Sequence, residues 1–178
     1  MSGMRRHIFL PAALVTMAFL LASSCGCGEG EGRPPLLESE KRLEGMYEEC
    51  RTIAISDPLG QHPDIDIEEI RRYENVDVEA VLVRSNGMEK PGVWTGVRLR
   101  DVLRGQGVEE PFVEIRIEAW DGYVARISYE MAMRPDTILA WAEDGAPIPR
   151  EQGPVRLVVG SEDGFYWIHR IVRMAIER

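Results

Sequence analysis

The stretch "VDVEAVLVRSNG" spans residues 76–87 and has the pattern of a strand that enters a protein core. Its apolar residues alternate with Asp77 and Glu79, and the stretch then becomes apolar on both sides up to Val83. Arg84 follows directly, ahead of a Ser-Asn-Gly turn signal. A guanidinium buried without a partner is costly, so Arg84 must find a partner or reach water.

The chain on either side of this strand alternates short strand patterns with short helix patterns. Residues 112–120 alternate, meet the turn Asp121-Gly122 and return over 123–128, which predicts a β-hairpin. Residues 97–108 have near-helical apolar spacing and a glycine stop. Residues 67–73 predict a second short helix, for which Asp64 or Asp66 is the N-cap.

Four more segments predict strands, at residues 50–56, 137–149, 153–160 and 166–177. Together with the others they make about seven strands and two or three short helices. The expected fold class is therefore α+β, mainly β, with mixed sheets, and the expected domain covers residues 48–178.

The first residues, "MSGMRRHIFLPAALVTMAFLLASSCGC", predict a secretion signal over residues 1–24. Two arginines precede an apolar run from Ile8 to Ala22, and small residues follow. The run is shorter than the ~20 apolar residues that a spanning helix needs, and no basic flank follows it. A permanent transmembrane helix is the less favoured interpretation.

The residues "LASSC" that end at Cys25 resemble a bacterial lipobox, in which the cysteine is acylated and becomes the mature N-terminus. The alternatives are an ordinary cleavage site with an incidental cysteine, or lipidation of Cys27, which fits less well. Residues 25–47 then contain the anchor cysteine and a flexible linker rich in Gly, Pro and Glu. The predicted location is the bacterial cell envelope, on the outer face of the cytoplasmic membrane, with attachment through acyl chains.

Charge and cysteine content restrict the partners and the metal chemistry. A net charge of −9 argues against binding to nucleic acid. Three cysteines are too few for a disulfide scaffold, although Cys27 and Cys50 could pair. No zinc, haem or iron–sulfur motif is present, so no metal ligands are predicted.

Four segments in order resemble the molybdopterin-binding domain of the sulfite oxidase family. The resemblance covers roughly residues 48–178, because the opening strand, proline turn, short helix and core strand also match. The segments are "GVWTGVRLRDVL" (92–103), "EAWDGYVARIS" (118–128), "ILAWAEDGAPIPREQGPVRLVV" (138–159) and "FYWIHRIVRMAI" (165–176).

The resemblance implies mixed sheets that hold a pterin-dithiolene molybdenum cofactor, which is usually used for two-electron oxo-transfer on a small substrate. The family places a metal-ligating cysteine just after the core strand, where this chain has Arg84. A guanidinium only donates hydrogen bonds, so it cannot ligate a metal. Asp121 and Arg156 match residues that contact the pterin or its phosphate, and Trp167 matches a tryptophan of the last strand.

Two other positions depart from the family pattern. Gln152 stands where the family has a histidine, and Tyr166 stands where it has a lysine. The matching residues also have ordinary structural explanations. Asp121 suits any tight turn, Arg156 can pair with a buried acid, and a tryptophan such as Trp167 is commonly a core residue.

Three functions remain open on the sequence. The first is a divergent, non-catalytic binding domain that takes an anion, a pterin-type ligand or a protein partner, with Arg84 as a binding group. The second is an active molybdenum oxidoreductase, whose metal would be held by the dithiolene and solvent oxygens. The third is a structural or adaptor lipoprotein with a filled pocket. The departure at residue 84 makes the molybdenum cofactor doubtful and favours the first.

Overall fold

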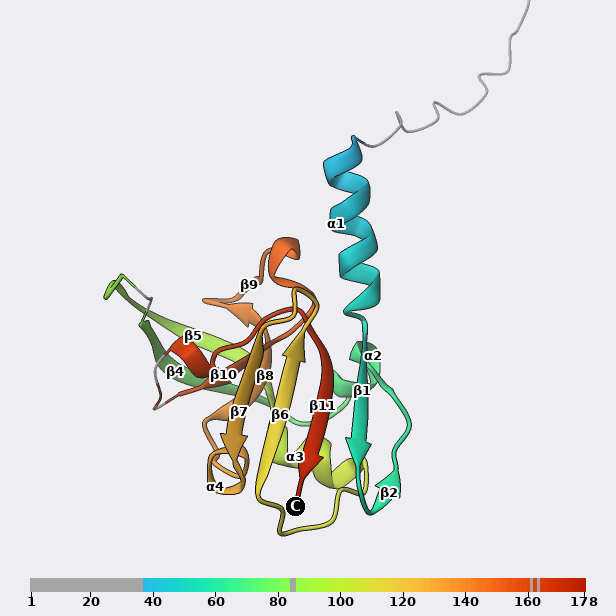
Figure 1. Cartoon of the computed structure of the whole chain (residues 1–178). Coiled ribbons are helices and arrows are strands. Elements are labelled where there is room, and N and C mark those ends of the chain that lie inside the picture. Colours follow the sequence, from blue (N-terminus) through green and yellow to red (C-terminus); the bar gives the residue numbers. More distant parts are fainter. Residues whose placement is uncertain (1–36, 84–85, 161, 163) are drawn as a thin grey trace, which may run out of the picture. The chain divides into compact units, whose positions relative to one another are not determined.

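The computed structural model describes residues 37–83, 86–160, 162 and 164–178, which form two β-sheets with short helices around them (Figure 1). The first sheet has the strand order β2-β1-β11-β6-β7, and β3 also pairs with β1. Strands β1 and β11 are parallel and its other pairs are antiparallel, so this sheet is mixed, as predicted. Its strands are β1 (Thr52–Asp57), β2 (Gly60–Gln61), β3 (Ile65–Asp66), β6 (Glu114–Ala119), β7 (Val124–Ser128) and β11 (Ile171–Glu177).

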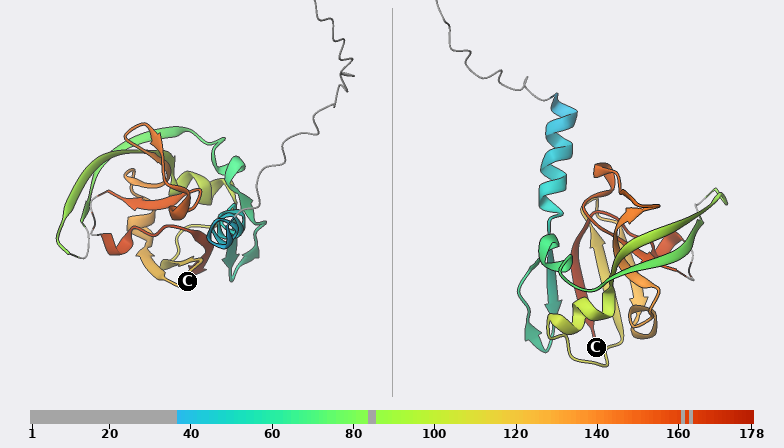
Figure 2. Two further views of the ribbon diagram at one scale, coloured as in Figure 1. Left: turned by 90° about the horizontal axis from the view of Figure 1, so that it is seen from above. Right: turned by 180° about the vertical axis from the view of Figure 1, so that it is seen from behind.

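The second sheet has the order β10-β8-β5-β4, with β9 paired to β8. All pairs between its described strands are antiparallel. β4 and β5 form a long hairpin whose far end projects away from the rest of the domain (Figures 1 and 2). The prediction that residues 76–83 enter the core at their end is therefore wrong, because β4 is an outer strand and Val81 is 41% exposed. The strands are β4 (Asn75–Val83), β5 (Glu89–Arg98), β8 (Thr137–Glu143), β9 (Ala146–Pro147) and β10 (Arg156–Val159).

Two of the helices of the described chain begin at side-chain caps. The Asp66 carboxylate accepts from the Glu68 N–H at the start of α2, and the Ser128 hydroxyl accepts from the Met131 N–H at the start of α4. The mainly β fold class is confirmed, with more helix than the two or three segments predicted. The elements are α1 (Glu38–Glu49), α2 (Ile67–Ile70), α3 (Leu99–Gly105), α4 (Tyr129–Ala132) and the 3-10 helices η1 (Arg150–Gln152) and η2 (Gly164–Tyr166).

Helix α1 lies in a region that was expected to be flexible linker up to residue 47. Met46 in the helix and Cys50, which caps its C-terminus, are buried and one turn apart, so they share a face. The Trp120 indole N–H donates to the Glu49 carboxylate at 2.6 Å, and Arg150 stacks on Tyr47 at 4.6 Å. These partners are distant in the sequence, so the composition of residues 25–47 does not reveal them. The contacts stabilise a helix in a segment whose composition predicted a flexible linker.

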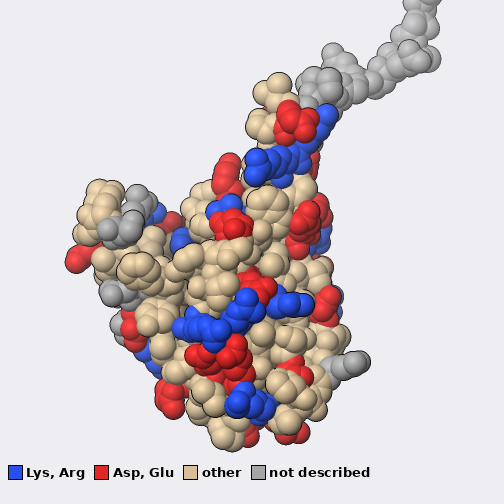
Figure 3. Space-filling model, viewed as in Figure 1, with Lys and Arg blue, Asp and Glu red and all other residues tan. Residues whose placement is uncertain are grey.

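The core is made of aliphatic side chains from both sheets and from α3. In β6 the inward residues Ile115, Ile117 and Ala119 are buried, which confirms the alternation of this segment. Helix α3 adds Leu99, Val102 and Leu103, all buried. The opposite faces of β6, β7 and β11 carry interspersed arginines and glutamates, including the pairs that Arg126 makes with Glu114 and Glu177 (Figure 3).

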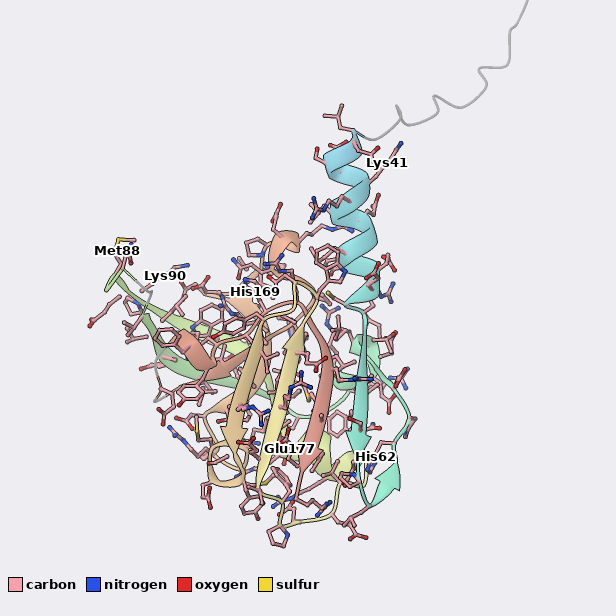
Figure 4. The ribbon with its side chains drawn as sticks, viewed as in Figure 1. Lys41, His62, Met88, Lys90, His169 and Glu177 are labelled. Carbon is pink, nitrogen blue, oxygen red and sulfur yellow. The ribbon has the colours of Figure 1, made fainter. Side chains whose placement is uncertain are left out.

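A buried acid joins β1 to the last residue of the chain. Arg178 donates from Nε and Nη2 to the two carboxylate oxygens of Asp57, at 3.0 and 2.7 Å. These bonds, helped by the Leu59 N–H and opposed by burial, lower the pKa of Asp57 from 3.8 to about 2. The ring of His62 (labelled in Figure 4) also lies near this carboxylate, with Nε2 3.5 Å from Asp57 Oδ2.

We expect this pairing to make stability depend on acid pH. Since the folded pKa of Asp57 is depressed, its contribution is complete above about pH 4 and is lost as the pH falls towards 2. The loss should be about 2 kcal/mol in the free energy of unfolding. Urea unfolding between pH 2 and 5 measures it, with Asp57→Asn as the comparison. Identical pH profiles for the two proteins would contradict the assignment.

Candidate functional site

A pocket of about 320 Å³ opens where the β6–β7 turn meets the segment between η2 and β11. The turn contributes Asp121 and Tyr123, and the other segment contributes Trp167, His169 and Arg170. Ala119, Gly164 and Ile168 complete the lining. His169 lies near the end of the first sheet from which this turn projects (Figure 4). Two segments some 45 residues apart in the sequence thus supply the polar groups of one cavity.

Arg170 organises the polar wall of this pocket. Its Nη2 lies 2.8 Å from Asp121 Oδ2, and its Nε donates to His169 Nδ1 at 3.1 Å. Its backbone has φ of +56°, in the left-handed region that non-glycine residues rarely adopt. The backbone is held there from both sides, because the Trp120 N–H donates to the Arg170 carbonyl and the Arg170 N–H donates to the Gln152 carbonyl.

His169 is uncharged at neutral pH. Burial lowers its pKa below the usual 6.5, and the neighbouring charges of Arg170 and Arg156 lower it further. Since arginine only donates, Nδ1 of His169 must accept, and the ring proton then sits on Nε2. The pocket wall therefore holds an acid, a cation and a neutral imidazole.

Tyr123 ties the hairpin to η2. Its hydroxyl donates to the carbonyl of Phe165 at 2.9 Å, while close to half of the side chain is exposed. The ring is thus held in place at the mouth of the pocket.

Trp167 and Arg156 form a buried stack behind the pocket. Trp94 and Trp167 meet edge to face, with ring centroids 5.4 Å apart. The Arg156 guanidinium carbon lies 5.2 Å from the Trp94 centroid and 5.9 Å from that of Trp167. The Trp167 indole N–H donates to the Val159 carbonyl at 2.9 Å, so this residue combines a core role with a place in the lining.

The structure brings together some of the predicted site residues and separates others. Asp121 and Trp167 line the pocket. Arg156 is buried one layer behind it and donates from Nη1 to the Gln152 side chain at 2.9 Å. Tyr166 ends η2 and packs against the core, outside the lining. Arg84 lies outside the described residues.

Sequence reasoning missed Tyr123, His169 and Arg170. A signal for Tyr123 was present, because it ends the Asp-Gly-Tyr turn that carries part of the resemblance. His169 and Arg170 directly follow the Trp-Ile pair of the last strand motif. Nothing local shows that Arg170 turns back towards Asp121, since that requires its left-handed backbone.

The described residues suit the organic part of a molybdenum cofactor better than its metal. The pocket offers donors, acceptors and aromatic surface to a small heterocycle. The described cysteine, Cys50, is fully buried beside α1, and burial raises the pKa of its thiol to about 11. Among the residues the structure describes, no group of three His, Cys, Asp or Glu side chains is placed to hold a metal ion.

Comparison with known proteins identifies the family to which this chain belongs. Residues 51–178 match the family described as oxidoreductase molybdopterin binding domain. Mitochondrial sulfite oxidase of Drosophila melanogaster is 34% identical over 119 residues, which are 57% of this chain and 20% of that protein. The crystal structure of the sulfane dehydrogenase SoxCD from Paracoccus pantotrophus shares the fold, with a TM-score of 0.63 and 21% identity over 71% of this chain and 38% of that one. The chain thus spans well under half of each relative, and it belongs to the oxidoreductase molybdopterin-binding domain family, of the sulfite oxidase type.

Proposed function

We propose that this domain is a binding domain that takes a pterin-type ligand and provides no thiolate to a metal. The observation that carries the proposal is the side-by-side placement of the Arg170 guanidinium and the Asp121 carboxylate on one wall of the pocket. A pterin ring presents hydrogen-bond donors and acceptors on adjacent atoms. Such a ring needs an acceptor and a donor from the protein at the same short spacing.

The remaining pocket residues support the same ligand class. The Tyr123 ring is fixed at the mouth and gives a flat apolar surface for stacking. His169 adds a neutral N–H donor. A volume of about 320 Å³ is at the lower end of the range for small-molecule sites.

The metal part of the proposal rests on the sequence. In the sulfite oxidase family the bound cofactor supplies two-electron oxo-transfer and takes one thiolate from the protein, at the position where this chain has Arg84. Arginine stays protonated and has no lone pair to offer. Cys50 is not a substitute, because its thiol is buried and stays protonated.

The test is to produce the full-length chain in a host that makes the cofactor and to analyse both metal and pterin. We expect a fluorescent pterin after oxidation, molybdenum well below one atom per chain, and a gain of molybdenum in Arg84→Cys. Asp121→Asn should lose the pterin. Asp144→Asn is the matched control, because it alters another Asp-Gly turn, whose residues do not line this pocket.

Each contrary result has a clear meaning. A full complement of molybdenum with dithiolene absorption bands would support an active oxidoreductase instead. Absence of pterin from the wild-type protein would support a structural or adaptor role for the domain.

We also propose that the protein is a lipoprotein of the cell envelope, anchored through Cys25. Among the described residues no helix is long and apolar enough to cross a membrane, and residues 1–36 lie outside the description. Cys25→Ser should abolish labelling by radioactive palmitate and move the protein from the membrane fraction to the soluble fraction. Cys27→Ser is the control and should leave both unchanged. Equal labelling of wild type and Cys25→Ser would contradict the anchor.

A further inference from the structure

Strand β4 is the outer strand of the second sheet and has an open edge. It ends the order β10-β8-β5-β4, and it pairs with β5 without interruption from Asn75 opposite Val97 to Val83 opposite Glu89. Among the described residues no strand pairs with its other side. At the far end of the strand Gly164 of η2 lies close to the Val83 carbonyl, so the open edge is the part up to Val81. The views from above and behind show this hairpin along the margin of the domain (Figure 2). Met88 and Lys90 lie at its far end (Figure 4).

The direction of the free backbone groups follows from the neighbouring strand. Val93 on β5 donates its N–H to the Asp144 carboxylate at 2.9 Å and accepts from the Asp144 N–H at 2.8 Å, so its backbone groups face away from β4. Val93 lies opposite Glu79. In an antiparallel pair, residues opposite each other either bond to each other or both face outwards. The N–H and C=O groups of Glu79 therefore point to the open edge. Those of Asp77 and Val81, two residues before and after it, point the same way.

Natural proteins protect edge strands by making them short or bulged, or by placing charged residues, especially lysine, or proline on them. Of these features β4 has only the two acids, Asp77 and Glu79. β4 has nine residues, "NVDVEAVLV", with no lysine, arginine, proline or glycine and no register shift against β5. A strand of this kind is a template for a further strand.

The side chains on the edge indicate the chemistry of the added strand. Asp77 and Glu79 share one face, and no ion pair among the described residues involves Glu79. Val81 (41% exposed) and Val93 (38% exposed) leave apolar surface beside them. An open groove of about 550 Å³ follows the same part of the hairpin, lined by Glu79, Val81, Pro91 and Val93 among others.

A second copy of this chain does not suit the edge. Pairing β4 along its full length with an antiparallel symmetry mate would bring Glu79 of one copy opposite Glu79 of the other, and like charges in directly opposite positions are destabilising. The net charge of −9 adds repulsion between whole molecules. A basic strand has neither problem, and the stems of lysine or arginine side chains can cover the exposed valines.

We propose that β4 binds a basic, extended segment of a partner protein as an additional strand of the second sheet. Lysine or arginine side chains of that segment face Asp77 and Glu79. Its alternate, apolar side chains extend the inner face formed by Val76, Val78 and Leu82, which pack against the core.

The experiment uses the full-length chain and an acetylated, amidated peptide of alternating lysine and valine, of the same nine-residue length as β4. Binding is measured by fluorescence anisotropy, and amide hydrogen exchange is followed by NMR. We expect saturable binding that slows exchange at Asp77, Glu79 and Val81. Glu79→Lys should weaken binding about five- to tenfold. Glu38→Lys, at the start of α1, changes the net charge equally and should have no such effect.

Val81→Pro tests the backbone bonds separately. Proline removes an outward N–H and is tolerated at a sheet edge, so this variant should fold and should lose binding. Three results would overturn the proposal: no binding by the wild-type protein, unchanged binding by Val81→Pro, or β4-dependent dimers in sedimentation that exclude the peptide. An equivalent peptide with glutamate for lysine is the charge control and should not bind.

Discussion

Replacing Arg178 with alanine is expected to lower the free energy of unfolding more than the removal of an exposed arginine without such contacts. Both carboxylate oxygens of Asp57 accept from this guanidinium, and the Asp57 side chain is only 1% exposed. The same guanidinium donates to the backbone carbonyls of Glu109 and Pro111. The substitution therefore leaves a buried charge unpaired and releases the loop before β6.

Urea unfolding at pH 7 measures this effect, and two variants control it. Arg173→Ala removes an exposed arginine from β11, the strand that precedes Arg178, and should change stability by less than about 0.5 kcal/mol. Arg178→Lys keeps the charge but loses the two-pronged contact, so it should fall between wild type and Arg178→Ala. Equal stability of the two alanine variants would show that Asp57 is satisfied without Arg178.

The strands of this domain were predictable because their signals are local. The alternation of residues 112–120 and the Asp121-Gly122 turn predicted the hairpin of β6 and β7, and the structure pairs Glu114 with Ser128 through to Glu118 with Val124. Short loops and two-residue periodicity are sufficient for such pairs. The parallel pairing of β1 with β11 joins opposite ends of the domain, and no local pattern indicates it.

The site was predictable only in part, for a related reason. Asp121 and Trp167 were identified because they belong to motifs that run along a strand or a turn. Arg170 acts on the pocket through a backbone conformation that contacts with Trp120 and Gln152 impose. Arg156 matches a ligand-contacting residue of the family, and its contacts with Trp94 and Trp167 could not be read from the sequence. Such placements depend on tertiary packing, which residue types alone do not reveal.

A second large effect on stability is expected from substitution of Gly96, in the Trp-Thr-Gly-Val motif. β5 approaches β8 so closely here that a Cβ on residue 96 would collide with the Leu139 carbonyl and lie 2.7 Å from Ala140 Cα. The pairing of β5 with β8 also shifts register between Thr95 and Gly96. The neighbouring atoms belong to backbone in the centre of a sheet, so they cannot rotate away as a side chain could.

Gly96→Ala should therefore destabilise the protein by about 3 kcal/mol or prevent its folding. Gly45→Ala is the matched control, since a Cβ there meets no atom within 4 Å and the residue lies inside α1. The same substitution should stabilise the protein at that position by about 0.5 to 1 kcal/mol, because alanine favours a helix. Urea unfolding of the two variants compares the same substitution at a crowded position in a sheet and at an open position on a helix. If both behaved alike, the glycine of the motif would not be required by the contact between β5 and β8, and a different constraint would have to explain it.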